Sequence, residues 1–196
     1  MQLPVPNAQR LRELGEQLEH LGFYRYTQPR HIPRLKAIFA KTGSLLDERT
    51  HRDYVADAER LAECGVAEFL GDVAPFLKAQ SIELEHVEEA CTPQSYRITV
   101  NGTQYVLYSA TELNAHIASN GMTTNIWELA ARRTCALLNK LLIEQGADER
   151  AFSLYGGNDH WVLFLTEALY EILCQSGVVE EVQHLHFYGP SELQQS

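Results

Sequence analysis

The amino-acid sequence predicts an α+β fold, in which helices pack on an antiparallel sheet of four to six strands. Two hairpin patterns, at residues 96–108 and 151–165, flank a long amphipathic stretch at residues 124–145. A hairpin yields a pair of antiparallel strands, and a helix with one apolar face covers such a sheet. We therefore expect a single α+β domain over residues 1–196, which is long enough to bury a core of its own.

The first part of this domain, residues 1–80, is expected to be mainly helical. Leucines recur at three- and four-residue steps over residues 11–21, which is the period of one helix face, and Gly22 ends the pattern. The aromatic residues at 23–26 indicate a short strand. Pro75 is expected to kink or split the last of the remaining helices. Those helices are predicted over residues 35–43, 57–64 and 66–80.

The second part, residues 81–188, is expected to hold the sheet and the long helix. Residues 82–85 alternate apolar and acidic side chains, which is typical of a half-buried strand. Asn101 and Gly102 supply the positive φ angles that the tight turn of the first hairpin needs. Residues 113–122 are predicted to be a loop with some helix.

The long helix is expected over residues 124–145, with Asn125 and Glu128 in the pattern of a capping box at its start. Gly146 suits the left-handed position that ends a helix. A shorter helix and a strand-like segment follow over residues 166–188. The apolar stripe of the long helix consists of Trp127, Ala130, Ala131, Thr134, Leu138, Leu141 and Leu142.

Charge is unevenly distributed along the chain, whose formal net charge is −10. Residues 1–52 carry a net charge of +4, residues 53–89 carry −8, and residues 151–196 contain six acidic side chains with no Lys or Arg. An acidic surface repels nucleic acid and attracts a basic partner. We expect the N-terminal basic group to pair with residues 53–89 rather than to bind phosphate. This group consists of Arg25, Arg30, His31, Arg34, Lys36 and Lys41.

The sequence indicates a protein of the reducing cytoplasm. It contains no apolar run near the roughly 20 residues that a membrane-spanning helix needs, and residues 1–11 lack the pattern of a secretory signal. The cysteines lack the close spacing of a metal site or redox motif, so we expect unpaired structural thiols, with a disulfide or metal site as the alternative. They are Cys64, Cys91, Cys135 and Cys174.

Few patterns in the sequence carry chemistry, and we predict no catalytic residue, metal site or cofactor. His184 and His186 are spaced to share one strand face but lack a third ligand at metal-binding spacing. The glycine-rich run at 156–160 lacks the Lys and the Ser or Thr of a phosphate-binding loop, and is therefore interpreted as a hairpin turn.

One region of the chain resembles a known class of proteins. Four runs within residues 96–173 carry the resemblance: residues 137–142 (LLNKLL), 148–150 (DER), 154–159 (LYGGND) and 164–166 (FLT). With the acidic composition and the missing catalytic motifs, they resemble immunity proteins of bacterial polymorphic-toxin and contact-dependent inhibition systems. The resemblance implies a cytoplasmic α+β protein that binds and neutralises a cognate toxin, whose surface is expected to be basic.

Seven residues are predicted to bind this partner. The carboxylates would face the basic surface of the toxin. The two aromatic residues beside the second hairpin turn would act as anchors, with burial in the core as the alternative. The residues are Glu83, Glu85, Glu88, Glu89, Tyr155, Asp159 and Trp161.

Two other classes of function stay open. One is a small enzyme whose site is assembled only by the fold, around His184 or His186. The other is a non-catalytic adaptor or regulatory subunit, or a homodimer that forms through an exposed sheet edge.

Overall fold

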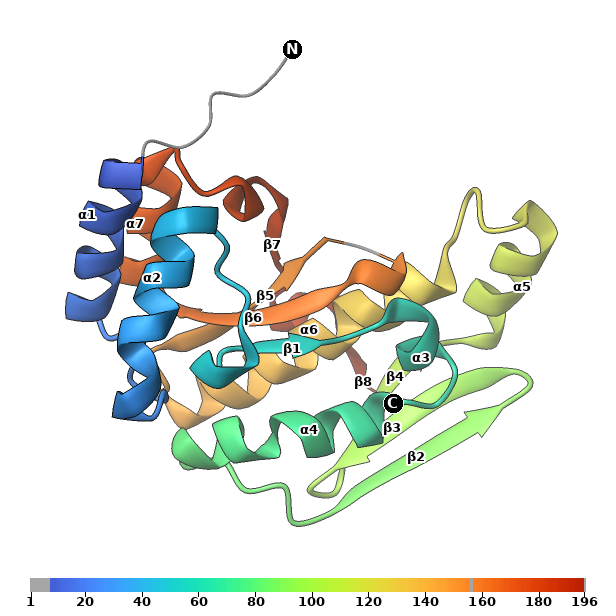
Figure 1. Cartoon of the computed structure of the whole chain (residues 1–196). Coiled ribbons are helices and arrows are strands. Elements are labelled where there is room, and N and C mark those ends of the chain that lie inside the picture. The colour runs from blue at the N-terminus through green and yellow to red at the C-terminus, as the bar shows by residue number, and fades with distance from the viewer. Residues whose placement is uncertain (1–7, 156, 196) are drawn as a thin grey trace.

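The computed structural model describes residues 8–155 and 157–195. These residues form two antiparallel sheets of four strands each (Figure 1). The first sheet contains, in spatial order, β1 (Asp53–Val55), β6 (Trp161–Thr166), β5 (Glu149–Leu154) and β7 (Leu185–Phe187). The second sheet contains β2 (Val87–Thr92), β3 (Ser95–Val100), β4 (Thr103–Tyr108) and β8 (Gln194–Gln195). The predicted α+β class is confirmed, and the strands form two sheets rather than one.

One set of helices covers the outer face of the first sheet, and a second set lies between the two sheets (Figure 1). The outer helices are α1 (Ala8–His20), α2 (Ile32–Thr42) and α7 (Glu167–Ser176). The helices between the sheets are α3 (Ala58–Ala62), α4 (Val66–Ala79) and α6 (Ile126–Gln145). Successive residues of a strand point to opposite faces. Accordingly, Val162 and Phe164 enter the core shared by the two sheets, whereas Leu163 and Leu165 pack toward α1 and α7.

The predicted N-terminal helices are confirmed, with corrections around them. Gly43 ends α2 with a φ of 73°, as its position predicted. Residues 23–26 form turns, not the predicted strand. The helix α4 continues through Pro75. Proline has no backbone N–H, so the carbonyl of Gly71 loses its hydrogen-bond donor within the helix. Both residues are exposed, so this carbonyl faces solvent.

The strand predicted at residues 82–85 is wrong, because the turn of the first hairpin competes for the backbone of this segment. The Asn101 side chain accepts hydrogen bonds from the backbone N of Glu85 and His86 at 2.9 and 3.2 Å. It also donates to the carbonyl of Glu83 at 2.8 Å. Residues 82–86 are therefore an irregular link into β2, a strand that the sequence pattern did not reveal.

The two predicted hairpins and the long helix are confirmed. The turn of the first hairpin has φ angles of 48° at Asn101 and 83° at Gly102. Asn125 caps the start of α6 and Gly146 ends it. However, Trp127 is 40% exposed and does not belong to the buried stripe.

Two segments gain or lose regular structure relative to the prediction. The segment predicted as a loop with some helix contains a regular helix, α5 (Ala110–Ser119). The strand predicted near the C-terminus shortens to β7, which follows a 3-10 turn at Glu180–His184. The turn of the second hairpin includes residue 156, which lies outside the described residues.

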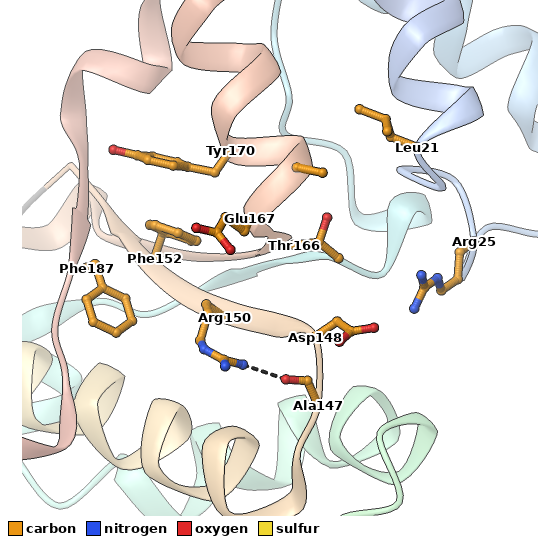
Figure 2. Close-up of a pocket in the computed structure, with 11 residues that line it drawn as sticks. Leu21, Arg25, Ala147, Asp148, Arg150, Phe152, Thr166, Glu167, Tyr170 and Phe187 are labelled. Atoms are coloured by element: carbon orange, nitrogen blue, oxygen red, sulfur yellow. Dashed lines mark hydrogen bonds between the residues drawn. The ribbon is translucent and has the colours of Figure 1, made fainter.

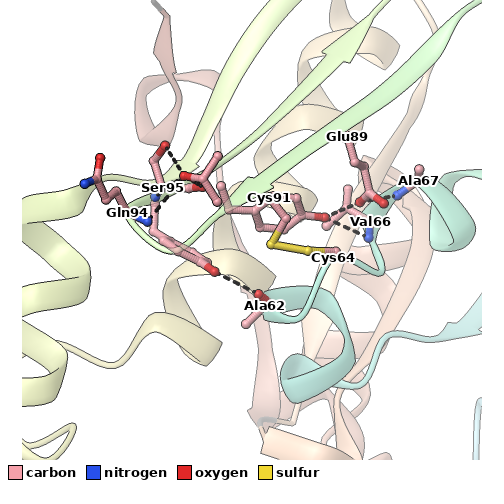
Figure 3. Close-up of a disulfide and its surroundings, with 11 residues drawn as sticks. Ala62, Cys64, Val66, Ala67, Glu89, Cys91, Gln94 and Ser95 are labelled. Carbon is pink, nitrogen blue, oxygen red and sulfur yellow. Dashed lines mark hydrogen bonds between the residues drawn. A yellow bond between two sulfur atoms is a disulfide. The ribbon is translucent and has the colours of Figure 1, made fainter.

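Cys64 and Cys91 form a disulfide that joins the end of α3 to β2 (Figure 3). The prediction of four unpaired cysteines is therefore wrong for this pair. The fold brings two Cα atoms that are 27 positions apart in sequence to 6.0 Å, which is within the span of a disulfide. Cys135 and Cys174 are free. Burial raises the pKa of the Cys135 thiol to about 12, so it stays protonated at neutral pH.

A fully buried ion pair joins the N-terminal helices to the first sheet. The Nη1 atom of Arg52 lies 2.9 Å from Oε2 of Glu149, and both side chains have no exposed surface. The hydroxyl of Tyr26 donates to Oε1 of Glu149 at 3.1 Å. The guanidinium also donates hydrogen bonds of 2.6–2.9 Å to the backbone carbonyls of Gly22, Phe23 and Phe164. The charges are thus paired and hydrogen-bonded, as burial requires.

The predicted pairing of the N-terminal basic group with residues 53–89 is wrong for the described ion pairs. Lys36 contacts Glu16 and Glu19 of α1 at 2.8 and 2.5 Å. Arg25 lies 3.8 Å from Glu149. Lys36 reaches the carboxylates of α1 because α1 and α2 pack side by side (Figure 1), whereas the carboxylate nearest Arg25 lies on β5.

Replacing Arg52 with Met is expected to lower the free energy of unfolding by about 3–5 kcal/mol, because Glu149 is left as an unpaired buried charge. Urea unfolding at pH 7 measures the loss. The control is Arg49→Met, since Arg49 pairs with Asp47 near the surface and its replacement should change little. Equal losses for the two variants would contradict this role of Arg52.

Candidate functional site

Three of the predicted acidic residues lie exposed where the chain enters the second sheet. Glu83 and Glu85 belong to the link that Asn101 holds, and Glu88 lies on β2. Glu88 is 3.1 Å from the imidazole of His86. These carboxylates are available to a partner.

Glu89 instead supports the fold. Its Oε1 atom accepts a hydrogen bond from the backbone N of Ala67 at 2.8 Å, at the start of α4 (Figure 3). It also accepts one from the hydroxyl of Tyr96, which in turn accepts from the backbone N of Val66 at 3.1 Å. A carboxylate at a helix N-terminus stabilises the helix through its unsatisfied N–H groups.

The predicted residues of the second hairpin also differ in their surroundings. Tyr155 is 39% exposed, and its ring centroid lies 5.3 Å from that of His184. Asp159 is exposed. Trp161 is half-buried and packs against the core of α1, α2 and the first sheet, which is the alternative that the sequence left open. The hairpin end and the link before β2 lie on different sides of the molecule, so the predicted residues do not form one surface (Figure 1).

A cavity of about 240 Å³ lies beside the second hairpin, where β5, β7 and the start of α6 meet. We call it the Ser153 cavity. Its polar and aromatic lining includes Trp127, Arg132, Ser153, Tyr155, His160 and His186. One of the predicted residues, Tyr155, therefore borders a cavity with a polar and aromatic lining.

Ser153 and His160 form a hydrogen-bonded pair at the base of this cavity. The Oγ atom of Ser153 lies 2.7 Å from Nε2 of His160. The Nδ1 atom of His160 lies 2.7 Å from the carbonyl oxygen of Ala56. A carbonyl only accepts, so Nδ1 carries the proton and Nε2 accepts from the serine hydroxyl. Burial lowers the pKa of His160 and favours this neutral form.

Exposed apolar side chains gather beside the same cavity. We call Trp127 and Tyr155, which are 40% and 39% exposed and both line this cavity, the aromatic end. The ring of His116 on α5 lies 6.1 Å from that of Trp127. Exposed large apolar groups that lie together are typical of an interaction surface.

Carboxylates surround the aromatic end. Glu128 lines the Ser153 cavity. Burial raises the pKa of the Tyr155 hydroxyl, and the nearby Glu181 and Glu180 raise it further. Three carboxylates therefore lie near the aromatic end, and Arg132, which is paired with Glu192, lines the same cavity.

A larger hollow of about 770 Å³ lies on the other side of β5 (Figure 2). Its lining combines the stacked rings of Phe152 and Tyr170, 4.7 Å apart, with two basic and two acidic side chains. The charged residues are Arg25, Arg150, Asp148 and Glu167. Their charges cancel, and Nη1 of Arg150 already donates to the carbonyls of Ala147 and Glu149. This hollow shows no preference for an ion of either sign.

Within residues 8–155 and 157–195, no three His, Cys, Asp or Glu side chains are grouped as a metal ion requires. His186 faces the Ser153 cavity, whereas His184 contacts Tyr155. No helix in this part of the chain has both the length and the apolar character needed to cross a membrane.

Comparisons with protein-family models, curated proteins and solved structures found no match for this chain. The resemblance to immunity proteins stays a prediction from the sequence.

The sequence reasoning missed the Ser153–His160 pair. A signal was present, because each residue interrupts or borders a strongly apolar strand of the second hairpin. Ser153 is the small polar residue between Phe152 and Leu154, and His160 precedes the apolar run of β6. The contact depends on the hairpin register, which pairs Leu154 with Trp161.

Lowering the pH below about 6.5, the ordinary pKa of histidine, is expected to destabilise the protein through His160. The folded state holds this imidazole neutral while the unfolded chain binds a proton, so stability falls by up to about 1.4 kcal/mol per pH unit until the lowered folded pKa is reached. Urea unfolding at pH 7.5 and 5.5 measures the effect. Between pH 7.5 and 5.5, His160→Gln should lose less unfolding free energy than the wild type. The exposed-site control His20→Gln should lose as much as the wild type. Identical pH dependence in all three proteins would refute this role.

Proposed function

We propose that the protein binds and neutralises a cognate bacterial toxin with a basic surface, through protein–protein contact at the aromatic end. The observation that carries the proposal is the coincidence of exposed apolar side chains with carboxylates at one end of the molecule. Binding free energy in interfaces is concentrated in a few aromatic and other large anchors. Complementary charge steers the partner and selects it.

The structure modifies the set of residues that would perform this binding. Tyr155 stays as an anchor, and Trp127, which is exposed beside it, joins it. Asp159 stays at the hairpin end. We call the exposed Glu83, Glu85 and Glu88 the second acidic surface. They belong to the link before β2 and to β2, which lie on a different side of the molecule from the end of the second hairpin (Figure 1).

The C-terminal segment supports a basic partner. Residues 151–196 contribute six carboxylates and no Lys or Arg, and they include the strands and turns beside Tyr155. A toxin that acts on nucleic acid needs a positively charged cleft. An acidic surface with aromatic anchors is suited to covering such a cleft.

Affinity for the captured toxin is expected to fall at least about 30-fold in the double variant Trp127→Ala/Tyr155→Ala, because each anchor contributes on the order of 1–2 kcal/mol. Tagged wild-type protein is used to recover the partner from the source cells, and calorimetry measures binding to the purified partner. The matched control is Glu83→Gln/Glu85→Gln/Glu88→Gln, which alters charge away from the aromatic end and should bind within a few-fold of wild type. Loss in the control alone would move the interface to the second acidic surface, and recovery of no toxin would refute the function.

We propose the cytoplasm as the compartment of this function, and the Cys64–Cys91 disulfide is the observation against it. Disulfides persist in oxidising compartments and are rare in a reducing cytoplasm. Acid quenching of the source cells, followed by alkylation with a mass tag, counts free thiols. After unfolding in denaturant, a cytoplasmic protein should show four alkylated cysteines, whereas two would place it in an oxidising compartment.

A further inference from the structure

We propose that Ser153 and His160 are the nucleophile and general base of an ester-hydrolysing site that accepts short acyl groups in the Ser153 cavity. This inference concerns a second activity and does not rest on toxin binding.

The first argument is the direction of the hydrogen bonds. A serine becomes nucleophilic when an adjacent base accepts its proton and a third group orients the base. Here the hydroxyl of Ser153 donates to Nε2 of His160 at 2.7 Å, and Nδ1 donates to the carbonyl of Ala56 at 2.7 Å. A backbone carbonyl thus takes the orienting position that a carboxylate holds in a Ser-His-Asp triad.

The second argument is that the base is fixed in place. The backbone N of Ala56 donates to the carbonyl of His160 at 2.8 Å, so the two residues hold each other through both backbone and side chain. His160 is almost fully buried, and Ser153 lies on the inner strand β5. A catalytic pair on rigid strands keeps its geometry better than a pair on loops. Burial also lowers the pKa of His160, so its Nε2 is unprotonated at neutral pH.

The third argument is access and charge stabilisation. Both side chains line the cavity of about 240 Å³, which limits the substrate to a small acyl group. Arg132 lines the same cavity, and its buried Nε–H has no partner among the described residues. That atom has no accessible surface, so the guanidinium acts through its positive charge, which favours the oxyanion that forms when an ester is attacked.

The reaction proceeds in two balanced steps. In the first, Oγ of Ser153 bonds to the carbonyl carbon of the ester while its proton moves to Nε2 of His160. The carbon–oxygen bond to the alcohol then breaks, the alcohol leaves with that proton, and the acyl group stays on Ser153. In the second, His160 takes a proton from water, the resulting hydroxide displaces the acyl group as a carboxylic acid, and the proton returns to Oγ.

The test uses the full-length protein with p-nitrophenyl acetate as substrate and a small fluorophosphonate as covalent probe. We expect saturable hydrolysis, and peptide mapping should place the probe on Ser153. Ser153→Ala and His160→Gln should each lower the saturable rate about 100-fold or more. Ser176→Ala is the control, because its hydroxyl donates to the carbonyl of Leu173 on α7, and it should keep the wild-type rate.

The outcomes separate a catalytic pair from a purely structural one. If folded wild-type protein carries no probe on Ser153, the proposal is wrong, whatever the variants do. An undiminished rate in a folded Ser153→Ala protein would also overturn it. Should Ser153→Ala fail to fold by circular dichroism, the mapped position of the probe on wild type still decides.

Discussion

The buried ion pair between Arg52 and Glu149 is the constraint on which the arrangement of the outer helices depends. Removing two charges from water is costly, and only a complete set of partners offsets the cost. The chain supplies them from the turn after α1, from β6 and from β5. The turn that follows α1 is thereby fixed to the first sheet by directional bonds, whereas the leucine contacts of α1 alone are non-directional.

The helix α6 has the corresponding role between the two sheets. The side-chain amide of Asn139, fully buried, bonds to both the N and the carbonyl of Ala151 on β5 and to the carbonyl of Tyr188. Since side chains alternate along a strand, fixing Ala151 toward α6 also directs Ser153 to the α6 side. The position of the Ser153 cavity thus follows from a structural contact two residues away on β5.

Local patterns were predictable from the sequence, and contacts between distant segments were not. Asn101 and Gly102 specify their turn by backbone preference alone, so the first hairpin was found at the correct residues. The same Asn101 side chain binds the backbone of residues 82–86 and prevents them from forming a strand. This contact spans about 16 residues and cannot be predicted from a local pattern. The Cys64–Cys91 bond and the Ser153–His160 contact likewise depend on how the strands are brought together. Of the predicted partner-binding residues, Glu89 is the least available to a partner, because its carboxylate accepts a hydrogen bond from the backbone N of Ala67 at the start of α4.

The weak attachment of the helix α5 affects local unfolding and the tolerance of insertions. This helix has no buried residue, and the ion pair from Glu112 to Arg133 ties its first turn to α6, whereas the bond from His116 to Thr124 stays within the segment. Such a segment opens at a much lower free energy than the core, because opening exposes little apolar surface. Protease nicking and amide exchange concentrate in segments of this kind, and so do tolerated insertions. The turn between α5 and α6, residues 120–124, therefore offers a place where the chain can be lengthened or labelled while both sheets stay intact.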